Sequence, residues 1–175
     1  YYVNAQYWGC LQKKGIGAEA LCRVVGKIGA CRVESGVYDV VVDRRVASTL
    51  VSPIISALRG EALHMKSSFL LDKRGDKIGS DKLTIVDNPR QYGKVGAKLF
   101  DNEGIAVVGM PIVEGGVLKN YYISNYMSKK MGVPMTQGGS TILEFGLGEN
   151  DTAEMIRKLG RGVYITGFKI GRAHV

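Results

Sequence analysis

The stretch Leu99–Gly132 constrains the fold of this chain most, because it carries the marks of a β-hairpin followed by a short helix. Two runs rich in apolar and β-branched residues, Ile105–Val113 and Val117–Ser124, flank the turn sequence Glu114-Gly115-Gly116. Glycine readily adopts the positive φ values that a tight hairpin turn requires. We therefore expect the two runs to pair as antiparallel strands.

Four features refine this module. Pro111 lacks an N–H group, so its strand is expected to lie at a sheet edge or to carry a bulge. Asn125 is expected to cap a helix over Tyr126–Met131, and Gly132 is expected to end it. The acidic turn Asp101-Asn102-Glu103-Gly104 precedes the first strand, and we interpret it as a solvated turn.

Apolar periodicity predicts helices elsewhere in the chain. The residues of Gly15–Ile28 include an apolar stripe at helical spacing, and Cys22 lies on this stripe, so we expect its thiol to be buried. Val46–Leu58 is also helical, and Pro53 fits either a kink or the start of a second helix. Asp151 and Glu154 have capping-box spacing, which predicts a helix over Thr152–Leu159.

The strand signals complete an α+β fold that is mostly antiparallel, with a hairpin-rich, barrel-like sheet and a few short helices. The run Val40–Val42 lacks alternation, so we expect it to be buried on both faces. The other predicted strands are Leu83–Val86, Ile142–Phe145, Val163–Gly167, and a pair formed by Cys31–Glu34 and Val37–Val42.

Both ends of the chain indicate that the sequence is part of a longer protein. It begins with Tyr1 rather than Met, and residues 170–175 resemble the translated read-through of a sequencing adapter. We divide the chain into the end of a preceding helical or linker region (residues 1–35), a domain truncated at its C-terminus (36–169) and the adapter remnant (170–175).

Composition narrows the class of protein. A hydrophobic content of 45% and a charged content of 23% are typical of a globular chain. The apolar runs are shorter than the roughly 20 residues that span a membrane. The formal net charge is +8, but the basic residues form scattered pairs without a nucleic-acid-binding motif, which makes nucleic acid an improbable ligand. Three cysteines without C-x-x-C spacing suit reduced thiols in the cytoplasm.

The sequence lacks the local motifs of common catalytic sites. It contains no P-loop, no G-x-G-x-x-G after a strand and no G-x-S-x-G. His64 is the one histidine outside the adapter remnant, and the cysteine spacing does not fit a zinc site. We therefore assign no catalytic and no metal-binding residue from local patterns.

Three segments resemble the TldD/PmbA family: VESGVYDVVVDRRVASTL, LRGEALHMKSSFLLDKRGDKIGSDKLTIVDNP and the opening stretch with its Phe100-Asp101-x-Glu103-Gly104 turn. The resemblance runs from about Tyr7 to Phe168. Members of this family pair as a heterodimeric metallopeptidase, TldD with PmbA (also called TldE). The resemblance identifies residues 36–169 as a PmbA/TldE-like domain of C-terminal type.

One window separates the two branches of the family. TldD-type subunits carry HExxxH on a helix, where two histidines bind zinc and the glutamate activates water. Leu58-Arg59-Gly60-Glu61 resembles the stretch that follows that motif, which places the window on Val51, Ser52, Pro53, Ile54, Ile55 and Ser56. Val40–Leu63 contains no histidine, so the resemblance is to the zinc-free PmbA/TldE branch.

The resemblance implies a non-catalytic subunit that supports a TldD-like partner in peptide processing. Zinc is expected only in that partner, and together the two subunits would enclose a chamber for a peptide or unfolded protein. Two alternatives remain open: a basic nucleic-acid-associated module, and a peptidase whose active site lies outside this sequence. The residues that we expect to line the chamber are Ser67, Ser68, Asp101, Glu103 and Gly104.

Overall fold

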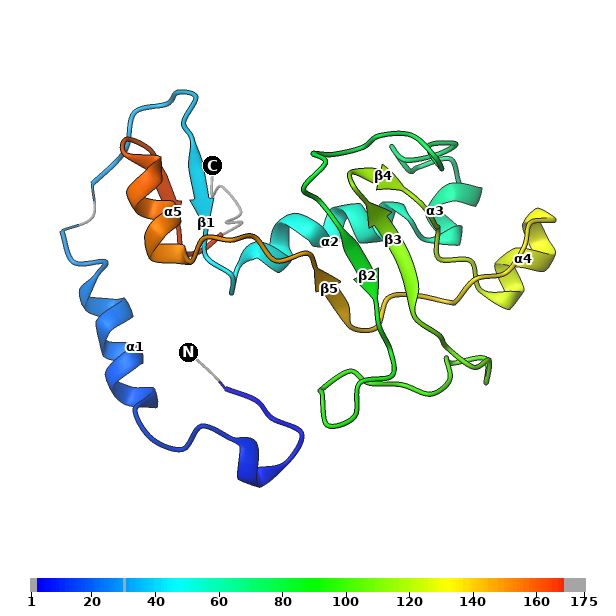
Figure 1. The fold of residues 1–175 in the computed structure, drawn as a ribbon, viewed down its shortest axis with the longest axis horizontal. Coiled ribbons are helices and arrows are strands. Elements are labelled where there is room, and N and C mark those ends of the chain that lie inside the picture. The colour runs from blue at the N-terminus through cyan, green and yellow to red at the C-terminus, as the bar shows by residue number, and fades with distance from the viewer. Residues whose placement is uncertain (1–2, 30, 169–175) are drawn as a thin grey trace, which may run out of the picture.

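The computed structural model describes residues 3–29 and 31–168 (Figure 1). The interpretation of residues 170–175 as an adapter remnant lies outside these residues. The elements within the described ranges are the 3-10 helix η1 (Trp8–Cys10), the helices α1 (Ile16–Val25), α2 (Ala47–Ala57), α3 (Gly60–His64), α4 (Asn125–Met131) and α5 (Thr152–Leu159), and the strands β1 (Val40–Val42), β2 (Ile85–Asp87), β3 (Met110–Glu114), β4 (Val117–Leu118), β5 (Leu143–Phe145) and β6 (Val163–Ile165).

Four strands form an antiparallel sheet in the order β4-β3-β2-β5, and α2 passes beside it (Figure 1). The predicted hairpin is confirmed: β3 and β4 are joined by Gly115 and Gly116, which have φ values of 55° and 77°. The α+β class is also confirmed. The sheet does not close on itself within the described residues, so the expected barrel-like shape is not confirmed.

Pro111 lies beside a bulge, which agrees with one of the two expectations from its missing N–H. Strand β3 lies inside the sheet, but Ile85 is opposite Val113 and Val86 is opposite Pro111, so one residue of β3 is left over. The side-chain amide of Asn120 donates to the Pro111 carbonyl at 2.8 Å. The bulge thus accommodates a proline in an internal strand.

The predicted strand pair of Cys31–Glu34 with Val37–Val42 is wrong. Strand β1 instead pairs in parallel with the distant β6, and Val41 is opposite Tyr164. Val40 is 51% exposed, so the expectation that this run is buried on both faces is also wrong. The run of valines correctly indicated a β-strand, because valine favours extended backbone. Burial of both faces would also require packed elements on each side of the strand, and the described residues do not supply them.

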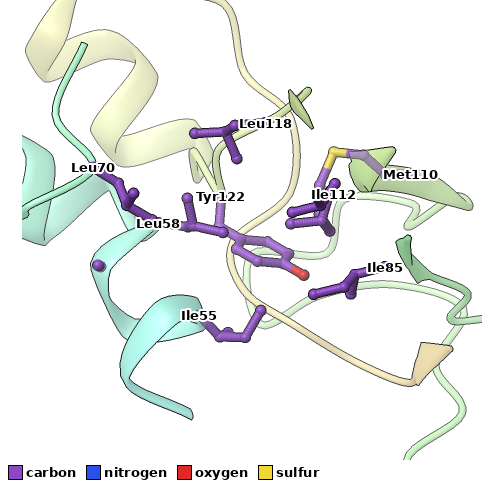
Figure 2. Close-up of a cluster of buried hydrophobic side chains, with 10 residues drawn as sticks. Ile55, Leu58, Leu70, Ile85, Met110, Ile112, Leu118 and Tyr122 are labelled. Carbon is purple, nitrogen blue, oxygen red and sulfur yellow. The ribbon is translucent and has the colours of Figure 1, made fainter. Parts of the chain in front are cut away.

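The hydrophobic core lies between α2, the sheet and the segment that follows β4. Tyr122 is central to it, and its ring packs among aliphatic side chains from these three elements (Figure 2). The Tyr122 N–H donates to the Leu58 carbonyl at 2.9 Å, and the Gly60 N–H donates to the Tyr122 carbonyl at 2.8 Å. The core residues are Ile55, Ala57, Leu58, Leu70, Ile85, Met110, Ile112, Val113, Leu118 and Tyr122.

The two helices predicted from the N-terminal half are both present. Pro53 lies inside a single helix, α2, which resolves the alternative of two helices. Helix α1 falls within the predicted range 15–28, but its residues are exposed or half-buried, and the expected burial of Cys22 is wrong because this thiol is exposed. The helical spacing of apolar residues correctly predicted a helix. It did not predict burial, because burial also requires another part of the protein to pack against the apolar stripe.

Of three predictions of helix ends, two are confirmed and one is corrected. Asp151 caps α5 as expected, because its carboxylate accepts from the Glu154 N–H at 2.7 Å. Helix α4 is capped by Ser124 rather than Asn125: the Ser124 hydroxyl oxygen accepts from the Met127 N–H at 3.2 Å, and Asn125 is the first helical residue. Gly132 ends α4 with φ 69°, as predicted.

Candidate functional site

A cavity of about 850 Å³ lies between α2, the loop before β3 and the segment that leads into β5. Its wall combines aliphatic and aromatic side chains with hydroxyl groups and both signs of charge. The lining residues are Ser48, Val51, Ser52, Ile55, Ser56, Arg59, Glu61, Lys98, Asp101, Asn102, Glu103, Val107, Ser124, Tyr126, Gly138, Gly139, Ser140, Thr141, Leu143 and Phe145.

Helix α2 contributes the face that contains the window singled out in the sequence. Val51, Ser52, Ile55 and Ser56 line the cavity. Their spacing of one and four residues places them on a single side of the helix. Pro53 and Ile54 lie outside the lining set. The positions that the family resemblance associates with HExxxH therefore face a cavity, and here they carry aliphatic and hydroxyl side chains.

The acidic turn forms part of the opposite wall, but its carboxylates already have partners. Asp101 Oδ1 accepts from the N–H groups of Glu103 at 2.9 Å and Ile105 at 3.0 Å. The two Glu103 carboxylate oxygens accept from the first N–H groups of α4, those of Asn125 at 2.8 Å and Tyr126 at 3.1 Å. These carboxylates shape the loop and fix α4 against it.

The other three residues expected to line a chamber lie outside the cavity lining. Ser68 is buried, and its hydroxyl donates to the Ala57 carbonyl at 2.5 Å and accepts from the Leu70 N–H at 3.0 Å. The exposed Ser67 hydroxyl donates to the Ala62 carbonyl at 3.3 Å. Gly104 is exposed with φ 76° and completes the acidic turn. The structure thus brings Asp101 and Glu103 together with α2 but not the two serines.

Asp87 organises the wall of the cavity, and sequence reasoning missed it. This residue is 0% exposed. Its carboxylate accepts from the Tyr122 hydroxyl at 2.9 Å, from Gln137 Nε2 at 2.9 Å, and from both the N–H and the hydroxyl of Thr141. Burial, together with the Asp87 carboxylate, raises the pKa of Tyr122. A carboxyl group within the apolar strand Ile85–Asp87 was the available signal.

This network joins the cavity to the core. Thr141 lines the cavity, and Gln137 directly precedes the lining residues Gly138 and Gly139. Tyr122 bonds through its backbone to the junction between α2 and α3. A buried carboxylate that lost these donors would carry a large desolvation penalty. Asp87 therefore holds the 137–141 segment at a fixed distance from α2.

The cationic groups of the cavity are loosely held. Arg59 Nε lies 3.8 Å from Glu61 Oε2, and both side chains are about half exposed. Lys98 has no ion-pair partner among the described residues. The cavity is therefore chemically mixed, with an apolar side from α2 and β5 and with loosely held cationic groups that can contact a ligand.

Within residues 3–29 and 31–168, no three His, Cys, Asp or Glu side chains are placed to hold a metal ion together. In the same residues, the helices are too short or too polar to cross a lipid bilayer.

The chain matches a known family over most of its length. Residues 35–175 match the profile described as the PmbA/TldA metallopeptidase C-terminal domain. A curated relative, the metalloprotease PmbA homolog of Haemophilus influenzae, is 28% identical over 154 residues, which is 86% of this chain. The match spans 34% of that relative, so the chain covers about a third of its length.

Solved structures show the same fold. A candidate modulator of DNA gyrase from Bacteroides thetaiotaomicron superposes with a TM-score of 0.95 at 46% identity, over 98% of this chain and 39% of that one. TldE from Thermococcus kodakarensis superposes with a TM-score of 0.60 at 22% identity, over 76% of this chain and 35% of that one. Because its sequence identity is low, the similarity to TldE from Thermococcus kodakarensis supports the fold alone.

Proposed function

This chain belongs to the TldD/PmbA family, and we propose that it is part of a zinc-free subunit of the PmbA/TldE type. In this proposal the subunit pairs with a TldD-like partner in the cytoplasm and supports the processing of peptides or unfolded protein. Zinc is bound by the partner, and this chain contributes a wall of the chamber in which the peptide lies.

The observation that carries the proposal is the composition of the α2 face. In TldD-type members, two histidines of HExxxH bind zinc and the glutamate activates water. The residues of the corresponding window that line the cavity are Val51, Ser52, Ile55 and Ser56. Aliphatic groups do not bind zinc, and serine hydroxyls are not among its usual protein ligands. This face is suited to contacting a peptide rather than cleaving it.

The rest of the wall supports the same role. Asp101 and Glu103, which we expected to line a chamber, line this cavity, and their carboxylates are engaged by backbone N–H groups. They are thus placed to shape the wall rather than to act as a base. A chamber-lining role for Ser67, Ser68 and Gly104 stays a prediction, since the partner subunit could extend the chamber toward them.

The proposal is tested by co-expressing the full-length protein with the TldD-like subunit encoded in the same genome. We expect a 1:1 complex whose peptidase activity is lost on chelation and restored by zinc. Replacing the glutamate of the partner's HExxxH by glutamine should abolish the activity, whereas Thr49→Ala in this chain, at an exposed position outside the cavity lining, should leave turnover largely intact. Peptidase activity in this full-length protein alone would contradict the proposal and favour an active site elsewhere in it.

A second candidate function is that of a basic nucleic-acid-associated module that binds DNA. Its support is the description of the Bacteroides thetaiotaomicron protein as a candidate modulator of DNA gyrase, together with the net charge of +8. Binding through phosphate contacts falls steeply with salt. We therefore measure DNA binding of the full-length protein at about 50 mM and 200 mM salt. Binding that is undetectable at the lower concentration would remove this alternative.

A further inference from the structure

The wall of the cavity contains two adjacent positions without a side chain, Gly138 and Gly139. Both are half-buried, and their φ values lie outside the left-handed region that favours glycine. A Cβ atom on Gly138 would lie 3.4 Å from Asp101 Oδ2. A Cβ atom on Gly139 would lie 4.0 Å from Arg59 Nη2. These are ordinary contact distances, so the fold of the described residues would accept alanine at either position.

Glycines that the fold requires have different surroundings. Gly60 lies where α3 contacts α4, and a Cβ atom on it would lie 3.0 Å from Met127 Cβ. Gly132 ends α4 with a positive φ. Among the described residues, neither crowding nor a positive φ explains Gly138 and Gly139. Glycine costs more conformational entropy on folding than alanine, and its remaining use is to let another group approach the backbone closely.

Hydrogen bonds hold the segment that contains the two glycines at both of its ends. Before the glycines, the Thr136 hydroxyl donates to the Tyr121 carbonyl at 2.6 Å. After them, the Thr141 N–H donates to the buried Asp87 carboxylate at 3.0 Å. The backbone between these ends therefore faces the cavity in a fixed position. A ligand that packs against it does not have to order the segment first, which lowers the cost of binding.

We propose that Gly138 and Gly139 form the wall of a subsite in the cavity, against which a bulky side chain of the bound peptide packs. The inference rests on the proposed function and deepens it, because it assigns to these two positions the role of setting which side chains fit. A methyl group added to this wall would enter the space that the peptide side chain occupies. Val51, Ile55 and Phe145 line the same cavity and supply the apolar surface that a large side chain requires.

The experiment uses the full-length protein in complex with its TldD-like partner, whose HExxxH glutamate is replaced by glutamine so that a bound peptide is not cleaved. The probes are two fluorescein-labelled serine octapeptides, one with two phenylalanines and the other with alanines at the same positions, and binding is followed by fluorescence anisotropy. In Gly138→Ala and in Gly139→Ala, the phenylalanine probe should bind about tenfold more weakly, as expected from overpacking by a methyl group. The alanine probe should bind within about twofold of its affinity for the unmodified complex.

The matched control is Gly148→Ala, which adds the same methyl group at an exposed position outside the cavity lining. A Cβ atom there would meet no atom of the described residues within 4 Å. Both probes should bind this variant as they bind the unmodified complex. Urea unfolding of each full-length variant should give a midpoint equal to or slightly above that of the unmodified protein, because alanine lowers the entropy of the unfolded chain. The unfolding measurement separates a contact with the peptide from a contact within the chain.

Several results would overturn the inference. Equal weakening of both probes would show that the two glycines do not set the size of a subsite. A lower urea midpoint in either test variant would show that another part of the full-length chain packs on them, and loss of the complex would assign them to the partner interface. The inference fails alone when the zinc-dependent complex cleaves peptides as proposed but the test variants bind the phenylalanine probe normally. A complex that does not form, or that binds neither probe, contradicts the proposed function as well.

Discussion

Two regions of the molecule were predicted from the same kinds of sequence pattern but differ in how deeply their side chains are buried. We call them the cavity region, which contains α2, α3, α4 and the four-stranded sheet, and the flanking region, which contains α1, β1, α5 and β6. The hydrophobic core cluster lies wholly in the cavity region. Residues of α1 and α5 are exposed or half-buried; Leu21 on α1 is 62% exposed, whereas Leu58 is 0% exposed. Periodicity therefore identifies a helix but not the surface that covers it.

Polar groups differ between the two regions in the same way. Asp87 in the cavity region is buried, whereas Asp43, which follows β1 in the flanking region, is half-buried. Each carboxylate accepts from a tyrosine hydroxyl, Tyr122 at 2.9 Å and Tyr164 at 2.7 Å. The two hydrogen bonds are similar in length, but the free-energy cost of losing them differs, because water can replace the lost partner at the half-buried Asp43 and not at the buried Asp87.

The largest effect should come from truncating a core leucine. Leu58→Ala removes a side chain that is fully buried at the junction of α2 and α3, and we expect it to lower the free energy of unfolding by about 3 kcal/mol. The matched variant Leu21→Ala in the flanking region should change it by less than about 0.5 kcal/mol. Urea unfolding of the full-length protein measures both. Equal losses would show that α1 is covered in the complete protein.

Removing the buried carboxylate should have the next largest effect. Asp87→Ala leaves the Tyr122 hydroxyl and the Thr141 groups without an acceptor and leaves the Gln137 amide with the Gly139 carbonyl alone, and we expect a loss of about 2 kcal/mol. Asp87→Asn keeps one acceptor oxygen and should cost less. Hydrogen exchange of the 137–141 segment should accelerate in both variants. Unchanged exchange there would contradict the role of Asp87 in holding the cavity wall.

Removing a helix cap should have a smaller effect that depends on the region. Ser124→Ala and Asp151→Ala each delete an acceptor for an N–H group, which is worth about 1 kcal/mol. Helix α4 buries Met127 at 2% exposure, so its cap should affect global stability. Loss of the α5 cap should produce only local fraying, seen as faster hydrogen exchange in Thr152–Leu159. Global destabilisation by Asp151→Ala would place α5 in the cooperative core.

The smallest effect concerns titration in the flanking region. The Arg45 N–H and, next, the Tyr164 hydroxyl hold the pKa of Asp43 below its ordinary value of 3.8. A lowered pKa means that the contribution of Asp43 to stability is present above its ordinary pKa and is lost as the pH falls through the folded-state pKa. Tyr164→Phe should raise the Asp43 pKa toward 3.8 in an NMR titration. An unchanged pKa would show that this hydroxyl does not donate to Asp43.

The successes of sequence reasoning are local. Helix α5 was predicted with its observed bounds because its signal, the capping-box spacing of Asp151 and Glu154, lies within its first turn. The turn at Gly115-Gly116 and the bulge beside Pro111 follow from the chemistry of single residues. The α2 face and the acidic turn were singled out separately, and the fold places both on one cavity.

The predictions that failed concern contacts between residues far apart in the sequence. Val40–Val42 pairs with Val163–Ile165, a partner at the other end of the chain that no local pattern could indicate. Asp87 was not singled out, because its acceptor role depends on Tyr122, Gln137 and Thr141, which come together only in the fold. The pairing of β5 with β2 was likewise invisible, since a strand signal does not tell which neighbours a strand has.

The measurement that tests the proposed function most directly is the zinc content of the full-length protein, purified alone and in complex with its TldD-like partner. We predict no stoichiometric zinc in the protein alone and one zinc per heterodimer, lost when a histidine of the partner's HExxxH is replaced by alanine. Stoichiometric zinc in the protein alone, together with peptidase activity, would contradict the assignment to the zinc-free branch.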